Sequence, residues 1–164
     1  MNLIDGIIQE LQYERISTRE VFSRIPENKW DWKPHEKSMS FGRLASHITE
    51  MYGWADTILN HDEFVLSTYK PFIATSKSEL LEVFDANVDD AIERLTGQEN
   101  AHLMKTWQMI GDERVLIKSP RIVVLKALMV NHTIHHRGQM SLYLRLADVP
   151  LPSIYGPSAD EERA

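Results

Sequence analysis

The residues of this sequence best suited to chemistry are three histidines, His47, His132 and His136. His132 and His136 are four residues apart, a spacing that puts their Cβ atoms about 5–6 Å apart on one helix face, where both imidazoles can bind one ion. His47 lies in a different apolar periodic segment, and helices that face each other in a bundle assemble metal sites in this way. The sequence contains no cysteine, so nitrogen and oxygen are the available ligands. Together these residues predict a site for one divalent metal ion.

An alternative explanation of the histidine pair is a hydrogen-bonded lining of the core, with no metal. If an ion is bound, three neutral imidazoles leave one position open for water or substrate, which is typical of catalytic zinc sites. Such an ion lowers the pKa of bound water to about 7, and that of a bound thiol further, so hydrolysis and thiol transfer are both chemically feasible. Imidazole binds several transition metals, and we expect zinc or nickel.

Four other side chains are candidates for a pocket above the metal. Gln139 and Tyr143 follow the histidine pair on the same helical sector, whereas Arg15 and Thr18 interrupt the apolar face of the first predicted helix. The alternative is that Arg15 extends to the surface and Gln139 satisfies a backbone carbonyl. None of the four has an assigned catalytic role.

Three residues close to the histidines in sequence are predicted to lie outside the metal sector. His135 is about 100° around the helix from His136, so we expect it to flank the site and to orient it from outside. Arg137 points away from the site and is interpreted as a structural ion-pair or interface residue. Glu50 falls opposite the apolar stripe of the second predicted helix. The sequence therefore offers no obvious general base.

Four amphipathic helices are expected to position these residues. Apolar residues recur at helical spacing over residues 3–25, 41–60, 76–97 and 119–147. Ser76 and Glu79 form a capping-box pattern, and Ser119 followed by Pro120 is a helix start signal. Four long helices in one chain predict a bundle.

The connections between these helices carry signals of their own. Residues 26–39 contain two prolines and two tryptophans without a period, which predicts an ordered loop packed by its aromatic side chains. Residues 100–118 contain a Gly-Asp turn signal between two partly alternating runs, so we expect a short hairpin or an irregular excursion. The polar end, SADEERA, is expected to fray.

Length and composition indicate one domain over residues 1–164, large enough to bury a core without disulfides. The formal net charge of −6, from 24 acidic and 18 basic residues, gives no basic surface for nucleic acid. No stretch approaches the ~20 apolar residues of a membrane span, and the start lacks a basic and apolar leader. We therefore expect a cytoplasmic protein with neither nucleic acid nor membrane as a partner.

Two segments, SMSFGRLASHITEMYGWAD and VNHTIHHRGQMSLYLRLADVPLP, resemble the signature regions of the DinB family of metalloproteins. Trp32, Lys33 and Pro34 match the family's aromatic, basic and proline stretch before the second helix. The resemblance covers essentially the whole chain. It implies an all-α fold, a four-helix bundle of up-down-down-up connectivity, with the same three histidines as metal ligands and frequently a dimer.

The resemblance narrows the function to a class. Relatives in the family include thiol S-transferases and isomerases that use low-molecular-weight thiols. We therefore expect a metal-dependent enzyme that acts on a small-molecule substrate, either a hydrolase or a thiol S-transferase. The alternative is a non-catalytic metal-binding or stress-related interaction protein, which the missing general base keeps open.

The last predicted helix also carries apolar residues away from its histidines. On a regular helical wheel Val123, Val130 and Ile134 fall together on the far side of the helix. A helix with two apolar faces is buried on both of them, and a two-fold homodimer is the commonest partner arrangement. We therefore predict a homodimer with Val130 and Ile134 at its interface. The alternative is that residues 100–118 fold back and cover this patch.

Overall fold

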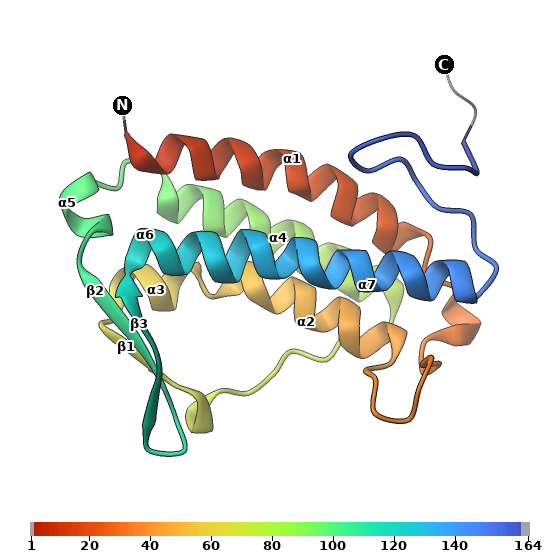
Figure 1. Ribbon diagram of the computed structural model, residues 1–164, viewed down its shortest axis with the longest axis horizontal. Coiled ribbons are helices and arrows are strands. Elements are labelled where there is room, and N and C mark those ends of the chain that lie inside the picture. The colour runs from red at the N-terminus through yellow and green to blue at the C-terminus, as the bar shows by residue number, and fades with distance from the viewer. Residues whose placement is uncertain (1, 162–164) are drawn as a thin grey trace.

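The computed structural model of the protein describes residues 2–161, and four long helical rods dominate it (Figure 1). The rods are α1 (Leu3–Ser23), α2 (Phe41–Gly53), α4 (Lys77–Leu95) and the continuous run from α6 to α7 (residues 121–146). Helix α1 packs against α4 and α7, and α2 packs against the same two helices. The first and last rods run in one direction and α2 and α4 in the other, which is up-down-down-up order (Figure 1). The predicted helical bundle is therefore confirmed.

A small sheet at one end of the bundle corrects the all-α expectation. Strands β1 (Glu63–Val65), β2 (Thr106–Gly111) and β3 (Arg114–Pro120) are ordered β1-β2-β3, with β1 parallel to β2 and β3 antiparallel to it. The β2–β3 turn has positive φ at Asp112 (48°) and Glu113 (59°), as a two-residue hairpin turn that matches the strand twist requires. Of the two alternatives for residues 100–118, the hairpin is correct, and a short helix α5 (Asn100–Leu103) precedes it.

The second predicted helix is two helices. Ser40 caps α2 by accepting a hydrogen bond from the Arg43 amide at 3.3 Å. The helix ends at Gly53, and α3 (Ala55–Asn60) follows after Trp54. The loop before α2 is anchored by its tryptophans as predicted: Trp30 Nε1 donates to the carbonyl of Ala74 at 3.3 Å, and a Cβ at residue 42 would lie 2.2 Å from that same nitrogen. Glycine at position 42 therefore allows the indole to lie against the helix.

The N-terminus of α4 is capped as the sequence indicates, with one shift. Ser76 Oγ accepts from the Glu79 amide at 3.2 Å. The Glu79 carboxylate reaches back to the amide of Thr75 at 2.7 Å, one residue before the cap, instead of to that of Ser76. Ser76 therefore satisfies a backbone donor that the first turn of the helix leaves free, and Glu79 ties the residue before the cap to that turn. Two single-turn 3₁₀ segments complete the connections, η1 (Glu27–Lys29) and η2 (Leu66–Thr68).

The last rod contains a π-helical segment. The continuous rod consists of three elements, α6 (Arg121–Val124), η3 (Leu125–Asn131) and α7 (His132–Leu146). Of these, η3 is the π-helical one. A π-helix bonds i to i+5, so its turns hold more residues than α-helical turns and the residues that follow are rotated from their positions on a regular wheel. Val130, predicted at the surface, is fully buried within the single chain. That part of the dimer interface prediction is therefore wrong.

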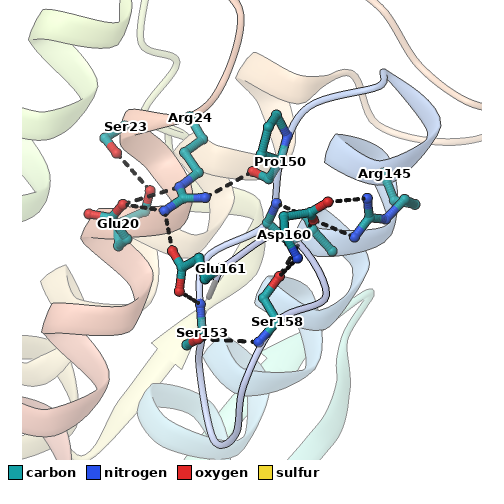
Figure 2. Close-up of polar contacts among 10 residues, drawn as sticks. Glu20, Ser23, Arg24, Arg145, Pro150, Ser153, Ser158, Asp160 and Glu161 are labelled. Atoms are coloured by element: carbon teal, nitrogen blue, oxygen red, sulfur yellow. Dashed lines mark hydrogen bonds and ion pairs between the residues drawn. The ribbon is translucent and has the colours of Figure 1, made fainter. Parts of the chain in front are cut away.

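The segment after α7 returns along the bundle and is fastened by ion pairs (Figure 2). Arg145 of α7 contacts Asp160 at 2.5 Å. Arg24, which follows α1, contacts both Glu161 at 2.7 Å and the carbonyl of Pro150 at 3.1 Å. The polar end was expected to fray, but Asp160 and Glu161 are held in place, and residues 162–164 lie outside the described part. Within residues 2–161, no helix is long and apolar enough to cross a membrane.

Candidate metal centre

The fold brings the three predicted ligands together between α2 and α7. His47 comes from α2, and His132 and His136 come from the first turn of α7 and the turn after it. The Nε2 atoms of His132 and His136 lie 2.6 Å apart, and the His47 ring centroid is 5.3 Å and 4.8 Å from theirs. One ring nitrogen from each histidine lies within 4.8 Å of the others. Small side-chain rotations can therefore bring the three nitrogens onto a single ion.

The outer ring nitrogens of two histidines have partners that fix their orientation. The Nδ1 atom of His47 lies 3.1 Å from a carboxylate oxygen of Glu50. The Nδ1 atom of His136 lies 2.7 Å from the amide oxygen of Gln139. Both partners are acceptors, so they favour the tautomer that carries its proton on Nδ1 and leaves the Nε2 lone pair for a metal. His135 is exposed and contacts Gln139 at 3.2 Å, which places it at the flank of the site as expected.

Burial favours the neutral form of two of these imidazoles, His132 and His136. The pKa of His132 is lowered to about 4 by desolvation first, and then by the neighbouring histidines. Desolvation also lowers the pKa of His136, and its hydrogen bond to Gln139 opposes this shift. Neutral imidazole is the form that binds metal. The lowered pKa values of His132 and His136 therefore favour the form of both side chains that can bind a divalent ion.

Glu50 is the residue near the triad that the sequence reasoning misjudged. It was predicted to face away from the core, but it is 3% exposed and contacts His47. The wheel failed because α2 is buried on almost all sides, with residues 44–46 and 48–52 all inaccessible to solvent. A single-stripe wheel describes a surface helix and cannot assign faces in such a helix. The usable signal was the spacing, since residues three apart on a helix are neighbours.

The four pocket candidates separate into two groups. Gln139 contacts His136, as described, and Tyr143 is buried against Trp32 and Phe41, with ring centroids 6.0 Å and 5.7 Å away. Arg15 is directed toward α4, where it forms ion pairs with two aspartates, Asp85 and Asp89. The alternative assigned to Arg15, a side chain at the surface, is therefore the correct one.

Thr18 also lies away from the histidines, in a second buried polar cluster between α1 and α7. Its hydroxyl accepts a hydrogen bond from Arg137 at 3.1 Å. Arg137 is 1% exposed and forms an ion pair with Glu14, and it also donates to the hydroxyl of Tyr155 at 2.6 Å. The interpretation of Arg137 as a structural ion-pair residue is confirmed. Arg15 and Thr18 interrupt the apolar face of α1 because Arg15 pairs with aspartates of α4 and Thr18 accepts a hydrogen bond from Arg137 of α7. Neither side chain has a polar contact with the triad among the described residues.

The sequence match to a family model agrees with this geometry. The model of the DinB family matches residues 2–163. The chain belongs to the DinB family. YrdA of Bacillus subtilis is a curated relative, 24% identical over 165 residues that cover 96% of this chain and 91% of YrdA. The signature segments around the three histidines thus belong to a match that spans nearly the entire sequence.

Solved structures of two DinB-like proteins and of YfiT share the fold. A DinB-like protein from Bacillus cereus superposes with a TM-score of 0.74 at 22% identity, covering 92% of this chain and 97% of that one. The DinB-like protein YjoA of Bacillus subtilis gives a TM-score of 0.71 at 21% identity, with 93% and 99% covered. YfiT of Bacillus subtilis, described as "a probable metal-dependent hydrolase with an unusual four-helix bundle topology", gives 0.66 at 10% identity, with 88% and 87% covered.

Proposed function

We propose that this DinB-family protein binds one divalent metal ion, zinc or nickel, through His47, His132 and His136. The observation that carries the proposal is the convergence of three ring nitrogens within 4.8 Å of one another. Two of the three imidazoles have their second nitrogen held by an acceptor, which is the support that metal-binding histidines commonly have. The low pKa of His132, about 4, keeps protons from competing with the metal near neutral pH.

The proposed activity is metal-dependent hydrolysis of a small molecule. The description of YfiT as a probable metal-dependent hydrolase supports it by analogy of fold. When bound, a divalent ion lowers the pKa of water to about 7 and so supplies a nucleophile at neutral pH. Glu50 and Gln139 hold the outer nitrogens of His47 and His136, and Tyr143, two helical turns after His136, packs against Trp32. A thiol cosubstrate in place of water would make the same site a thiol S-transferase.

Metal analysis of variants tests the site. We expect about one ion per chain in the purified protein and a metal content near zero in His132→Ala and in His136→Ala, because each loses one of three ligands. His61→Ala is the matched control, since His61 is an exposed histidine outside the triad. Full metal loading of the His132→Ala/His136→Ala double variant would contradict the proposal.

An activity screen tests the reaction. Metal-loaded protein is assayed against ester, amide and phosphoester substrates, with and without a low-molecular-weight thiol. Hydrolysis that requires metal and no thiol supports the hydrolase, and turnover that requires the thiol supports the transferase. A protein that binds metal and turns over none of these substrates under either condition would favour the non-catalytic metal-binding alternative.

We also propose a homodimer. Leu142 and Leu146 are 58% and 54% exposed and lie one helical turn apart on α7, and the half-buried Ile134 precedes them on the same helix. Exposed apolar side chains on one helix are typical of an interface between copies of a chain. Light scattering should give the mass of a dimer for the wild type and of a monomer for Ile134→Glu. A monomeric wild type, or a variant that stays dimeric, contradicts the proposal.

A further inference from the structure

The carboxylate of Glu50 is buried and has a separate partner on each oxygen. Its side chain is 1% exposed. Oε2 lies 3.1 Å from His47 Nδ1, and Oε1 lies 3.2 Å from a terminal nitrogen of Arg43. The three residues occupy positions i, i+4 and i+7 of α2, which lie along one face of a helix. Two contacts from one rigid element therefore fix both the position and the rotation of the carboxylate plane.

A purely structural ion pair with Arg43 does not account for this arrangement. The Arg43 side chain is 32% exposed, so an acidic partner at the surface would neutralise it without burying a carboxylate. Burying an ionised carboxylate is costly unless its hydrogen bonds are made inside the protein. The second of these hydrogen bonds goes to the outer nitrogen of a proposed metal ligand. The hydrogen bond that offsets the cost of burying the Glu50 carboxylate is thus the same one that orients His47.

We propose that Glu50 is the positioning residue that orients His47 for the metal and that Arg43 holds Glu50 in place. This inference rests on the proposed metal site. Glu50 acts by accepting the Nδ1 proton of His47, which directs the Nε2 lone pair into the triad and increases its basicity. Because each oxygen of Glu50 already has a partner and the side chain is shielded from solvent, the geometry favours a positioning role over that of a general base.

The other ligand with an outer partner provides an internal comparison. His136 is held by the neutral amide of Gln139, and His47 by the charged carboxylate of Glu50. Hydrogen bonds to an ionised acceptor are roughly twice as strong as neutral ones. Loss of the Glu50 charge should therefore weaken metal binding more than loss of the Gln139 amide does. The two supports are unequal even though the two ligands are equivalent in type.

Metal affinity measured by competition with a chelating dye tests the proposal, with Zn²⁺ and Ni²⁺ as probes. We expect Glu50→Gln to raise the dissociation constant about 10- to 100-fold, the effect typical of losing such a partner. Thr49→Val is the matched control on α2, because Thr49 is fully buried, its hydroxyl has no hydrogen-bond partner among residues 2–161, and it touches none of the histidines through a polar contact. The control should leave the affinity within about twofold of wild type.

A double-variant cycle separates positioning from a general charge effect. The His47→Ala background keeps two histidines and binds metal only weakly, so its residual affinity is measured by direct titration with excess metal. If Glu50 acts through His47, Glu50→Gln should change that residual affinity less than about threefold. An equal loss in both backgrounds, or no loss in the wild-type background, would overturn the proposal. If Glu50→Gln does not fold, Arg43→Met is tested in its place. A metal affinity equal to that of the wild type in Arg43→Met would then overturn the proposal. A wild type that binds no metal would refute the proposed site itself, so the two failures are distinguishable.

Discussion

Two neighbouring residues on α7, His136 and Arg137, belong to two polar clusters of opposite design. On the side of His136, three imidazoles face one another, and the outer nitrogens of His47 and His136 each have an acceptor partner. On the side of Arg137, a full charge is matched by Glu14, and the hydroxyl of Tyr155 bonds to both of them. One cluster directs lone pairs at a common point, and the other leaves little hydrogen-bonding capacity unused. The first design is suited to binding an ion and the second to holding helices in register.

Removing the charge on the α1 side should cost the most stability. Arg137→Met leaves Glu14 buried without its counter-ion, so we expect the free energy of unfolding to fall by about 3–5 kcal/mol. Urea denaturation measures this change. The control is Arg137→Met combined with Glu14→Leu, which removes both charges and should recover most of the loss. A double variant as unstable as the single one would mean that the ion pair is not the cause.

Metal should stabilise the protein only through the histidine cluster. At a free metal concentration of one hundred times the dissociation constant, we expect the free energy of unfolding to rise by about 2.7 kcal/mol. The same metal concentration should leave His132→Ala unchanged. Calorimetry or urea denaturation with and without metal measures both values. A similar rise in His132→Ala would indicate that the ion binds elsewhere.

Acid should weaken the metal-free protein through His132. The pKa of this imidazole is about 4 in the folded chain and about 6.5 in an unfolded one. Between these values the unfolded chain binds more protons, so stability is full above pH 6.5 and is lost as the pH falls toward 4. Unfolding measured across this range should show a flatter profile for His132→Asn than for the wild type. Parallel profiles would contradict the assigned pKa.

The smallest effect is expected at the tail. Tyr155→Phe removes one hydroxyl from the Arg137 cluster but keeps the ring, which stacks on Tyr13 with centroids 6.3 Å apart. We expect a loss of about 1 kcal/mol in the free energy of unfolding and no change in metal affinity. A change in metal affinity would show that the two clusters are coupled through α7.

The sequence predicted the long helices and the histidine pair because both depend on local spacing, whereas His47 was added from its place on a second helix and from the family resemblance. A histidine pair four residues apart and apolar residues at helical intervals can be recognised without knowledge of the tertiary structure. Glu50 was misplaced because α2 is buried on nearly all sides, so the side opposite its apolar stripe is also inside the protein. The partners of Thr18 and Arg137 depend on how α1 and α7 pack, which is a tertiary property. The short strand β1 pairs with β2 more than forty residues away in the sequence. A strand of three residues is too short to show an alternating pattern, so the sequence could not predict it.

The π-helical segment makes the metal site sensitive to chain length. Its residues, 125–131, stand directly between the hairpin end of the last rod and His132. Inserting one residue next to this segment, beyond what its wider turns already hold, would turn everything after the insertion by about 100° relative to α6. The histidine pair would then face away from His47, although all three histidines were still present. A single-residue insertion at this place would thus disrupt the proposed site as completely as the loss of one histidine.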